Sequence, residues 1–253
     1  MKIISYNVNG LRAAINKDIK KWLEEEQPDV LCIQETKLQP EQLPADVFES
    51  MGYHVYLHSA QRKGYSGVAL ITRTKPNQIV YGIGEERYDV EGRFLRADFG
   101  DLSVVSIYHP NGTSGEERLT YKMEWLNYFH KEMNELRKTR PNLVLCGDYN
   151  IAHQEIDIHD PVRNAKYSGF LPMEREWFTQ FLADGYIDSF RNKHPSEQVY
   201  SWWSYRFKAR ERNKGWRIDY CITTTPLASH IKRASILTDV IHSDHCPILL
   251  ELD

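Results

Sequence analysis

The sequence predicts an α/β protein in which sheets are covered by helices. Short runs of β-branched and aromatic residues recur along the 253 residues, and several of them are apolar at every position rather than at every second one. Such strands are covered on both faces, because a strand with one solvated face alternates apolar and polar residues. Amphipathic helical patterns separate the runs, as expected where helices cover the sheets.

The expected strands are bounded by turn residues and occur in both halves of the chain. In order, they comprise residues 2–6, 29–34, 53–58, 67–72, 93–99, 102–108, 142–147, 218–223, 234–239 and 247–252. Helices are expected at 18–26, 115–137 and 173–182, where apolar residues recur three or four positions apart. The longest helix carries Leu119, Met123, Leu126 and Phe129 on one stripe. The segment 148–172 is long, polar and interrupted by proline and glycine, which is typical of a functional loop.

Composition limits the class of protein. Hydrophobic residues make up 41% and charged residues 26% of the chain, which excludes collagen-like, disordered and coiled-coil classes. No linker, repeat or abrupt change of composition divides it, so we expect a single domain over residues 1–253. No apolar run has the length of a signal peptide or a membrane span, and we expect neither secretion nor a membrane association.

Charge and cysteine content narrow the class further. A formal net charge of -3 is not that of a polycation that packages nucleic acid, so any nucleic-acid contact has to be local. The four cysteines, Cys32, Cys146, Cys221 and Cys246, are far apart in sequence and form no C-x-x-C pair. This spacing argues against a disulfide scaffold or a thiolate zinc site and favours a reducing, cytoplasmic location.

Polar side chains follow three of the expected strands at the point where each strand ends. Asn7 follows the first strand, Glu35 the second, and Asp148 and Asn150 the strand at 142–147. Strand ends are where ligands bind in covered α/β sheets. The alternative for any one Asn or Asp is a turn residue that bonds its own backbone. Glu35 argues against that alternative, because Glu is a poor turn residue and gains little there without a partner.

A second polar group precedes the last expected strand. Ser243, Asp244 and His245 are consecutive and cannot form a contiguous catalytic triad, because neighbouring side chains of an extended chain point to opposite faces. His245 therefore needs an acid from elsewhere to hold its tautomer, and Asp219 is a candidate. The alternative is a structural histidine with satisfied hydrogen bonds.

These oxygen-rich candidates favour a hard cation over zinc. Without histidine pairs or thiolates, the ligand types suit Mg²⁺, or Mn²⁺ as a substitute. Mg²⁺ takes one or two carboxylates and phosphate oxygens while it keeps several waters, so Glu35 with one or two of the Asp and Asn groups would suffice. Such a cation suggests phosphate chemistry.

A basic and aromatic stretch lies between Trp202 and Trp216. Its cations include Arg206, Lys208 and Arg210, and its aromatic residues are Trp203, Tyr205 and Phe207. Aromatic side chains among phosphate-binding charges suit a nucleic-acid strand. The alternative is an ordinary solvated face.

Six motifs together resemble the exonuclease III family of abasic-site endonucleases. They are Asn7-Val8-Asn9-Gly10-Leu11-Arg12, Gln34-Glu35-Thr36-Lys37, Tyr108-His109-Pro110-Asn111, Gly147-Asp148-Tyr149-Asn150, Trp216-Arg217-Ile218-Asp219-Tyr220 and Ser243-Asp244-His245-Cys246-Pro247. The resemblance implies a four-layer α/β sandwich, with two mixed β-sheets face to face and helices outside. It also implies Mg²⁺-dependent cleavage of the phosphodiester 5′ to abasic sites in double-stranded DNA, as in base excision repair, with some 3′ to 5′ exonuclease or 3′-phosphodiesterase activity on 3′-blocked ends.

The resemblance assigns the metal and catalytic residues. Glu35 is the principal metal ligand, and the residues that complete one or two metal positions are Asn7, Asp148, Asn150, Asp244 and His245. An in-line water needs a base, for which Asp148 is the candidate, and Asn150 fixes Asp148 and donates a hydrogen bond to the developing charge. His245, held by Asp219, donates to a phosphoryl oxygen. The rival assignment makes His245 the base. Tyr108 and Asn111 reach the scissile phosphate, unless Tyr108 is a core tyrosine with a satisfied hydroxyl.

The resemblance also implies the DNA contacts. An abasic nucleotide flips cheaply because it has no base to unpair, and Trp202, Trp216 and Ile218 line its pocket. The other expected DNA contacts are Arg12, Lys37, Tyr65 and Asn164, together with the cations of the basic stretch. Two departures affect the grip on the duplex: Ser114 stands where some relatives place an arginine wedge, and Tyr167 replaces an amide. We expect a monomer, because one site encloses one lesion.

Two rival functions differ in class. Related phosphoesterases hydrolyse inositol phosphates, sphingomyelin or mRNA tails with a similar set of residues, and the basic stretch favours DNA over these substrates. A DNA-binding protein without catalysis would lack at least one of Glu35, Asp148, Asn150 and His245, and all are present.

Overall fold

The computed structural model describes residues 1–253 and contains two six-stranded sheets. The first sheet has the order β11 (Ile231–Ile236), β12 (Ile248–Leu252), β1 (Lys2–Asn7), β2 (Val30–Gln34), β4 (Val68–Thr72) and β3 (His54–His58). The second has the order β5 (Gln78–Tyr81), β6 (Phe94–Phe99), β7 (Leu102–Tyr108), β8 (Asn142–Asp148), β10 (Asp219–Thr224) and β9 (Tyr186–Asp188). In each sheet one central pair is parallel, β1 with β2 and β7 with β8, and the other pairs are antiparallel.

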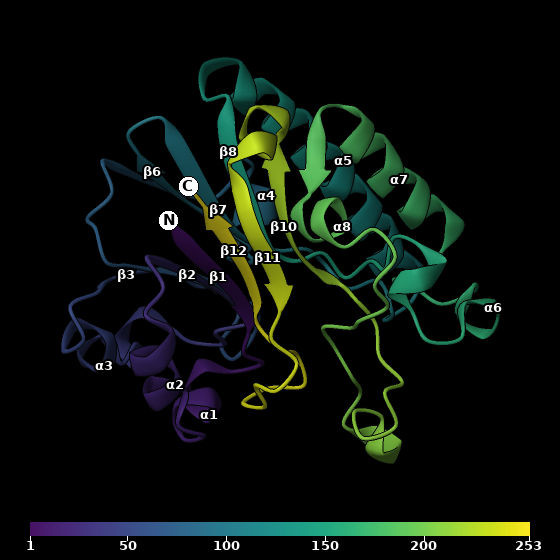
Figure 1. Ribbon diagram of the computed structural model, residues 1–253, viewed down its shortest axis with the longest axis horizontal. Coiled ribbons are helices and arrows are strands. Elements are labelled where there is room, and N and C mark those ends of the chain that lie inside the picture. The colour runs from purple at the N-terminus through teal and green to yellow at the C-terminus, as the bar shows by residue number, and fades with distance from the viewer.

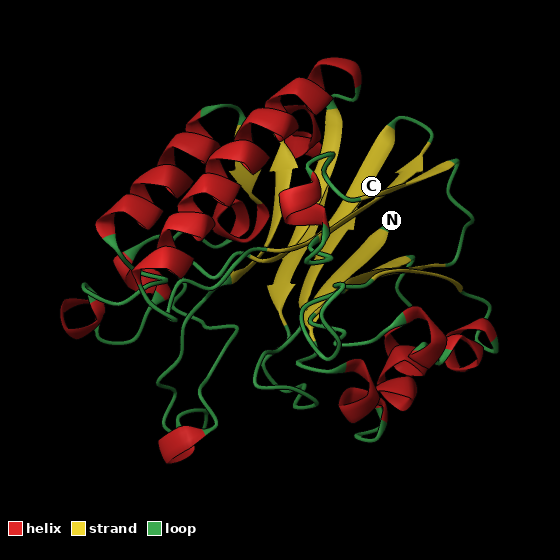
Figure 2. Cartoon of the chain, turned by 180° about the vertical axis from the view of Figure 1, so that it is seen from behind, coloured by secondary structure: helices red, strands yellow, loops and turns green.

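The sheets pack face to face, and helices cover their outer faces (Figure 1). On the first sheet lie α1 (Leu11–Ile15), α2 (Ile19–Glu26) and α3 (Ala45–Glu49), and on the second lie α5 (Glu116–Thr139) and α7 (Pro172–Ala183). Short helices α4 (Glu86–Asp89), α6 (Pro161–Asn164) and α8 (Ser189–Lys193) and four 3₁₀ turns, Pro40–Gln42, Glu155–Asp157, Arg206–Lys208 and Thr225–His230, lie in the connections. Seen from behind, the strands lie between two groups of helices (Figure 2). The prediction of a four-layer α/β sandwich is confirmed.

The uniformly apolar strands follow from this layering. In β2, Val30 and Cys32 face the other sheet, while Leu31 and Ile33 face the helices. In β8, Val144 faces the first sheet and its neighbours on the strand pack under α5 and α7. Both faces of these central strands are therefore removed from water, which is why the sequence shows no alternation there.

The two long helices have the terminal chemistry that helices require. Glu116 and Glu117 lie in the first turn of α5, and Arg137 and Lys138 lie in its last turn, so each pair complements the helix dipole. Pro172 occupies the first turn of α7, where its missing N–H costs nothing. None of the helices combines the length and the apolar character needed to cross a membrane.

The observed elements differ from the expected ones in a few places. The strand expected at 234–239 is wrong by three residues, since β11 ends at Ile236 and the backbone turns from Leu237 to Val240. The segment 148–172 is not a plain loop, because it contains a 3₁₀ turn and α6. The edge strands β5 and β9 and the short helices were not expected from the sequence.

The topology brings the polar strand ends together. The parallel pairs β1–β2 and β7–β8 end at the same edge of the sandwich, so Asn7, Glu35, Tyr108 and Asp148 meet there. The antiparallel neighbour β10 begins at that edge with Asp219, which pairs with Asp148 across the two strands. The site is thus built at the ends of four strands and the beginning of a fifth.

Candidate active site

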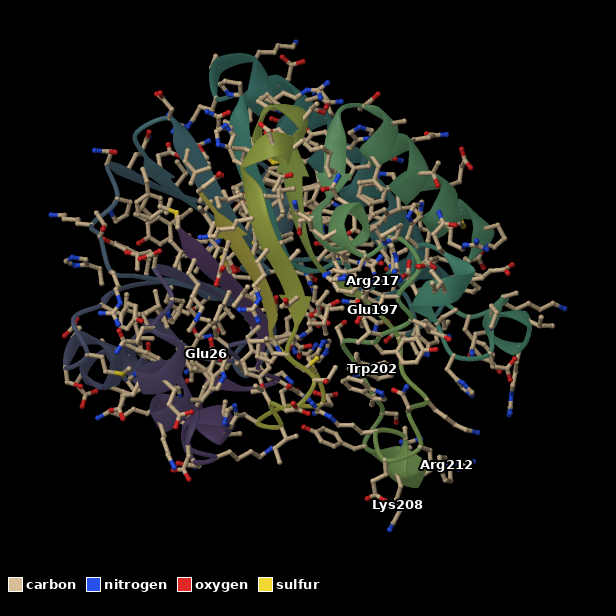
Figure 3. The ribbon with its side chains drawn as sticks, viewed as in Figure 1. Glu26, Glu197, Trp202, Lys208, Arg212 and Arg217 are labelled. Carbon is tan, nitrogen blue, oxygen red and sulfur yellow. The ribbon has the colours of Figure 1, made fainter.

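A cleft of about 470 Å³ opens at this edge of the sandwich. Its lining consists of Asn9, Glu35, Tyr108, Asn111, Thr113, Asp148, Asn150, Asn164, Tyr167, Ser168, Gly169, Trp202, Trp216, Ile218, Asp244 and His245. Trp202, labelled in Figure 3, lies at the base of a segment that extends away from the body of the protein. The cleft therefore joins the catalytic and pocket residues that the resemblance implies.

Asn7 joins two carboxylates at the floor of the cleft. It is fully buried, and its side-chain amide donates to Glu35 Oε1 and to Asp148 Oδ2, each at 2.9 Å. Its oxygen accepts the backbone N–H of Asn9 at 3.0 Å. In this arrangement Asn7 orients the carboxylates through its N–H groups.

Glu35 enters the cleft from a left-handed backbone position. Its φ is 52°, directly after β2, which turns the side chain toward Asn7 and Asp148. Burial by itself would raise the pKa of Glu35, but Lys37 Nζ at 3.0 Å from Oε2 and the Asn7 amide hold the pKa below its ordinary value. Glu35 is therefore an anion at neutral pH.

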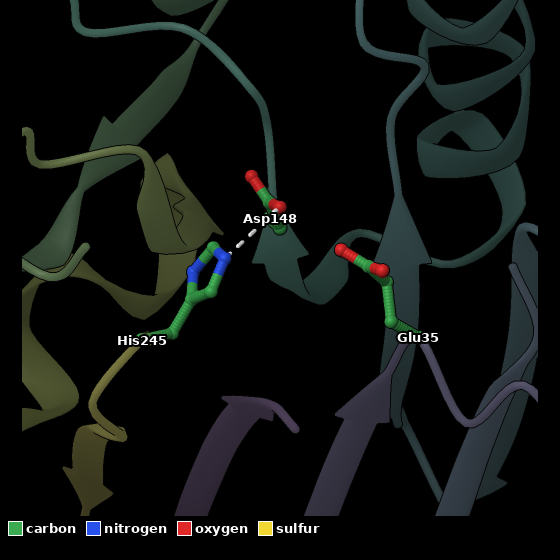
Figure 4. Close-up of side chains that lie close together, drawn as sticks. All are labelled: Glu35, Asp148 and His245. Carbon is green, nitrogen blue, oxygen red and sulfur yellow. Dashed lines mark ion pairs between the residues drawn. The ribbon is translucent and has the colours of Figure 1, made fainter. Parts of the chain in front are cut away.

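Glu35, Asp148 and His245 form a cluster of possible metal ligands, which we call the acidic cluster (Figure 4). One ligand atom from each lies within 4.8 Å of the other two, and His245 Nε2 is 3.9 Å from Asp148 Oδ2. Burial, followed by the nearby charge of Asp219, raises the pKa of Asp148 to about 8. Gly147 allows this strand end to form, because a Cβ there would be 1.8 Å from the carbonyl oxygen of Ile107.

His245 is held from behind by Asp219. The ring Nδ1 is 2.9 Å from Asp219 Oδ2, and both side chains are buried. Burial alone would lower the pKa of His245, but Asp219 raises it to about 10. Ser201 donates to the same Asp219 oxygen at 2.6 Å, while Asp219 Oδ1 is buried without a partner. The imidazole is therefore a cation at neutral pH, and its Nε2–H faces Asp148.

Asn150 is fixed by the surrounding chain on both its side chain and its backbone. Its φ is 51°, its N–H donates to Asp148 Oδ1 at 2.8 Å, and its amide donates to the carbonyl of His109 at 2.9 Å. Asn111 donates to the Asn150 side-chain oxygen at 3.3 Å. Lys122 donates to the Asn150 carbonyl at 2.8 Å. The left-handed backbone of Asn150 is therefore held by hydrogen bonds with Asp148, His109 and Lys122.

A fully buried ion pair lies behind this loop. Lys122 Nζ is 2.5 Å from Glu174 Oε1, and both residues are 0% exposed. Glu174 also accepts hydrogen bonds from Ser168 and from the backbone of Gly169 and Leu171. The pair therefore connects α5 and α7 to the wall of the cleft.

Tyr108 has its ring against a buried arginine. The Arg93 guanidinium lies 4.7 Å from the ring centroid and donates to the Tyr108 carbonyl at 2.9 Å. Burial and the nearby Glu35 raise the pKa of Tyr108 well above its ordinary value. The hydroxyl is therefore a hydrogen-bond donor at any physiological pH.

Two tryptophans form one wall of the cleft. The rings of Trp202 and Trp216 pack edge to face, with centroids 6.1 Å apart, and their backbones exchange hydrogen bonds of 2.9 Å. Ile218 lies beside them and is buried. Arg217, between Trp216 and Ile218 in sequence, points into the protein and donates to Asp157. The pocket wall is thus anchored from below by an ion pair.

The expected DNA contacts lie in different settings. Arg12 and Lys37 border a shallow groove, and Asn164 lines the cleft while its amide donates to two backbone carbonyls. The stretch between Trp202 and Trp216, which we call the extended segment, carries the exposed side chains of Arg206 and Lys208, and Figure 3 shows Lys208 at its tip.

Two further expected DNA contacts are engaged inside the protein. Arg210 donates to the carbonyls of Ser243, Thr238 and Val240 and packs on the ring of Trp203. The Tyr65 hydroxyl accepts hydrogen bonds from Arg93 and Arg118. Both side chains hold neighbouring loops in the free protein.

The comparison with known proteins decides the family. The family model of the Endonuclease/Exonuclease/phosphatase family matches residues 4–245. The chain belongs to this family. It is 47% identical over 252 residues to an exodeoxyribonuclease of Bacillus subtilis, a match that covers 99% of this chain and 98% of that protein. It is 45% identical over 255 residues to the DNA repair nuclease APEX1 of Danio rerio, covering 100% of this chain and 82% of the relative.

A solved structure agrees with the family assignment. The AP endonuclease from Archaeoglobus fulgidus superimposes with a TM-score of 0.92 at 33% identity and covers 100% of this chain and 99% of that one. The resemblance to the exonuclease III group of the Endonuclease/Exonuclease/phosphatase family is confirmed.

The residues present fit the divalent cation that members of this family use. Glu35 and Asp148 of the acidic cluster offer carboxylate oxygens within a small volume, and Asp219 adds a further buried carboxylate behind them. The cations nearby are the imidazole and Lys37. Three carboxyl groups beside two cations leave a site that is negative once Asp148, whose pKa is raised to about 8, is ionised. Oxygen ligands suit a hard cation.

The other expected metal ligands have partners within the chain. Asn7 presents its oxygen to the backbone of Asn9, and Asn150 presents its oxygen to Asn111. Asp244 lies outside the acidic cluster and accepts hydrogen bonds of its own. Among the Asp, Glu and His residues of the expected set, Glu35, Asp148 and His245 are the ones whose ligand atoms lie within 4.8 Å of one another.

Several residues that support the side chains of this cleft were not identified from the sequence. Lys122, Ser201 and Arg93 contact expected catalytic residues or their backbone. Glu174 pairs with Lys122 and accepts the backbone N–H of Gly169 in the cleft wall. Lys122 carried a signal, because it lies next to Met123 on the apolar stripe of a helix, where a charge needs a buried partner. The others carried no local signal, since their partners are distant in sequence.

Proposed function

We propose that this chain is a divalent-cation-dependent DNA repair nuclease that hydrolyses the phosphodiester 5′ to abasic sites in double-stranded DNA. We propose as well a weaker activity on 3′ ends, as an exonuclease or 3′-phosphodiesterase. It acts as a monomer. The four free cysteines suit a reducing compartment.

One observation carries this proposal. The acidic cluster lies on the lining of the same cleft as Trp202, Trp216 and Ile218. A phosphate held at the cluster would therefore place a neighbouring sugar against the aromatic wall. An abasic sugar fits such a wall at little cost, because no base has to be unpaired. The exodeoxyribonuclease, DNA repair nuclease and AP endonuclease among the relatives agree with this substrate.

Glu35 is the residue that would chiefly hold the cation, with Asp148 beside it in the acidic cluster. When bound, Mg²⁺ supplies charge that offsets the negative phosphate and its developing charge during attack. Mn²⁺ suits the same oxygen ligands. The Asn7 amide keeps both carboxylates in place in either case.

The pKa shifts divide the remaining roles between Asp148 and His245. A general base works best when its pKa is close to the working pH, and burial with Asp219 raises the pKa of Asp148 to about 8. Asp219 raises the pKa of His245 to about 10, so the imidazole carries a proton at neutral pH. We therefore assign Asp148 to the attacking water and His245 to a phosphoryl oxygen as donor. The rival with His245 as base would need a neutral imidazole.

Tyr108 and Asn111 complete the phosphate site. The Tyr108 hydroxyl is a donor because its pKa is raised, first by burial and then by Glu35. The Asn111 amide lines the cleft beside Asn150. Both groups can donate to non-bridging phosphate oxygens, which accumulate charge during the displacement.

The extended segment favours DNA over a small phosphoester. Tyr205 and Phe207 are 67% and 85% exposed there, in a stretch that carries Arg206 and Lys208. Exposed aromatic and basic side chains side by side suit a nucleic-acid backbone and its bases. A phosphatase for a soluble metabolite has no use for such a surface.

The test is incision of a 5′-labelled duplex that carries one tetrahydrofuran abasic analogue, with Mg²⁺, with Mn²⁺ and with EDTA. We expect one cation-dependent product that ends at the nucleotide before the lesion. An undamaged duplex of the same sequence is the control, and a duplex with a 3′-phosphate measures the activity on 3′ ends. An intact abasic duplex in every condition would contradict the proposal and favour another phosphoester.

A further inference from the structure

Asp244 has an unexpected environment for a residue beside His245. Its Oδ2 accepts the Trp202 indole N–H at 3.0 Å. Its Oδ1 accepts the Asn9 amide at 3.0 Å and the Ser243 hydroxyl at 3.1 Å. Both carboxylate oxygens are therefore occupied by donors from within the chain, and Asp244 is not a member of the acidic cluster.

Trp202 depends on this contact for its orientation. The indole has a single polar group, so its one hydrogen bond decides how the ring turns. The ring is half-buried, edge to face with Trp216 and 6.4 Å from the His245 ring. Within the pocket wall, Trp202 thus lies between Trp216 and the His245 imidazole.

The backbone around this contact is already fixed. Trp202 pairs with Trp216 through two hydrogen bonds of 2.9 Å, and the Trp203 N–H donates to the Asp244 carbonyl at 3.0 Å. Cys246 donates to the carbonyl of Ser201 at 2.8 Å. The backbone hydrogen bonds therefore fix the main-chain position of Trp202, and the Asp244 carboxylate fixes the orientation of its ring.

We propose that Asp244 is a positioning residue that holds the Trp202 indole in the pocket wall, and that it is not a ligand of the cation. A hydrogen bond to a carboxylate is roughly twice as strong as one between neutral groups. If Asp244 turned to ligate the cation, the Trp202 and Asn9 side chains would lose their acceptor. The two uses of this carboxylate compete, and the structure assigns it to the pocket.

The part of this inference that concerns specificity rests on the proposed function. A ring held at a fixed angle favours a sugar without a base over an intact nucleotide, because a rigid wall does not move aside. Loss of the Asp244 contact frees the ring while its hydrophobic surface remains. Discrimination between abasic and undamaged DNA should then fall while the chemistry persists.

The first experiment measures cation binding without DNA. Mn²⁺ binding by electron paramagnetic resonance is compared for the wild-type protein, Asp244→Ala and Glu35→Gln. We expect Asp244→Ala to bind Mn²⁺ within about threefold of wild type, while Glu35→Gln weakens binding by about tenfold or more. Equal weakening by the two variants would overturn the proposal. This arm decides the role of Asp244 even if no incision is found with any DNA.

The second experiment measures the pocket. We compare Trp202→Phe, which removes the N–H and keeps a ring, with Asp244→Ala, Asp244→Asn and the double variant Trp202→Phe/Asp244→Ala. Trp202→Phe and Asp244→Ala should each raise KM for the tetrahydrofuran duplex about three- to tenfold with a smaller effect on kcat. The double variant should be no worse than the poorer single variant, and Asn should restore most of the effect because its oxygen can accept the indole N–H.

The outcomes separate the two proposals. Additive losses in the double variant, or a fall in kcat without a change in KM, would overturn the positioning role of Asp244. An inactive wild-type protein would contradict the proposed function instead. Thermal unfolding of each variant verifies that it is folded before its kinetics are compared.

Discussion

Two buried groups of charged side chains lie close to each other in this protein and differ in balance. The first, which we call the balanced cluster, consists of Arg191, Arg217, Asp157 and Asp188. Arg217 donates to Asp157 at 2.7 Å and to Asp188 at 2.8 Å, and Arg191 also donates to Asp157. Two guanidinium groups thus meet two carboxylates. The acidic cluster and Asp219 have three carboxylates beside one imidazole and Lys37.

The pKa values of two aspartates show what this difference means. Both Asp157 and Asp148 are buried, and burial by itself would raise the pKa of each. Arg217 and Arg191 overcome burial at Asp157 and hold its pKa below the ordinary value. At Asp148, Asp219 adds to the effect of burial and raises the pKa to about 8. A buried carboxylate with its own arginine is structural, whereas one without is available to a cation or a proton.

The largest predicted effect is on turnover. His245→Ala should lower the incision rate by roughly 10²- to 10⁴-fold, because the donor acts mainly on the charge that develops during attack. Binding to the abasic duplex should change by less than about threefold. Single-turnover incision and equilibrium binding measure the two quantities, with His230→Ala, an exposed histidine, as the control. Parallel losses of binding and rate would contradict the assigned role.

The balanced cluster should show its largest effect on stability. Arg217→Met leaves two buried carboxylates without their main partner and should lower the free energy of unfolding by about 3–5 kcal/mol. Arg233→Met, at an exposed pair with Glu251, should change it by less than about 0.5 kcal/mol. Urea denaturation measures both. A loss as small as that of the control would show that the cluster is not needed for the fold.

The acidic cluster should respond to the cation instead. Glu35→Gln should raise the Mg²⁺ concentration for half-maximal incision by about tenfold or more, and high Mg²⁺ should recover part of the rate. Glu211→Gln, at an exposed position of the extended segment, should leave the Mg²⁺ dependence of incision unchanged. Incision by Glu35→Gln that does not depend on Mg²⁺ concentration would contradict the role of Glu35 as a ligand.

The smallest predicted effect is a gain of stability with a distinct pH dependence. Because the pKa of Asp148 is raised from 3.8 to about 8, its ionisation in the folded, cation-free protein costs stability above pH 4 and most fully at pH 8. Asp148→Asn should therefore raise Tm in EDTA at pH 8, by about 2–4 °C for each kcal/mol recovered, and by less at pH 5.

The matching substitution in the balanced cluster should have the opposite sign. The pKa of Asp157 is lowered, so its contribution is present above the ordinary value of 3.8 and is lost as the pH falls through the folded pKa. Asp157→Asn should lower Tm at pH 8. Thermal unfolding of both variants across this range checks the pair, and the same direction of change in both would remove the distinction between the clusters.

Much of the fold follows from local sequence. Strands such as β2 and β8 are apolar at every position because both faces are covered, and this pattern is visible without a structure. The edge strand β9 is three residues long, too short for any periodicity to be recognised. The short helix α1 has the same limitation, since five residues do not complete two turns.

The site could be predicted from the sequence where a polar residue directly follows an apolar strand. Glu35 and Asp148 are predicted this way, because each stands where an apolar strand ends. The parallel pairs β1–β2 and β7–β8 bring these two strand ends to one edge of the sandwich. The Lys122–Glu174 pair could not be found, since its members are 52 residues apart and lie on different helices. The acceptor of the Trp202 indole is likewise 42 residues away. Such contacts depend on the folded topology, which local patterns do not specify.

The most direct measurement counts the bound cations and locates them. Mn²⁺ titration by electron paramagnetic resonance compares the wild-type protein, Glu35→Gln/Asp148→Asn and Asp157→Asn. We predict that the wild-type protein and Asp157→Asn bind Mn²⁺ with similar affinity, while the double variant of the acidic cluster loses that binding. Retained binding in the double variant, or its loss in Asp157→Asn alone, would contradict the claim that the unbalanced acidic cluster is the metal site.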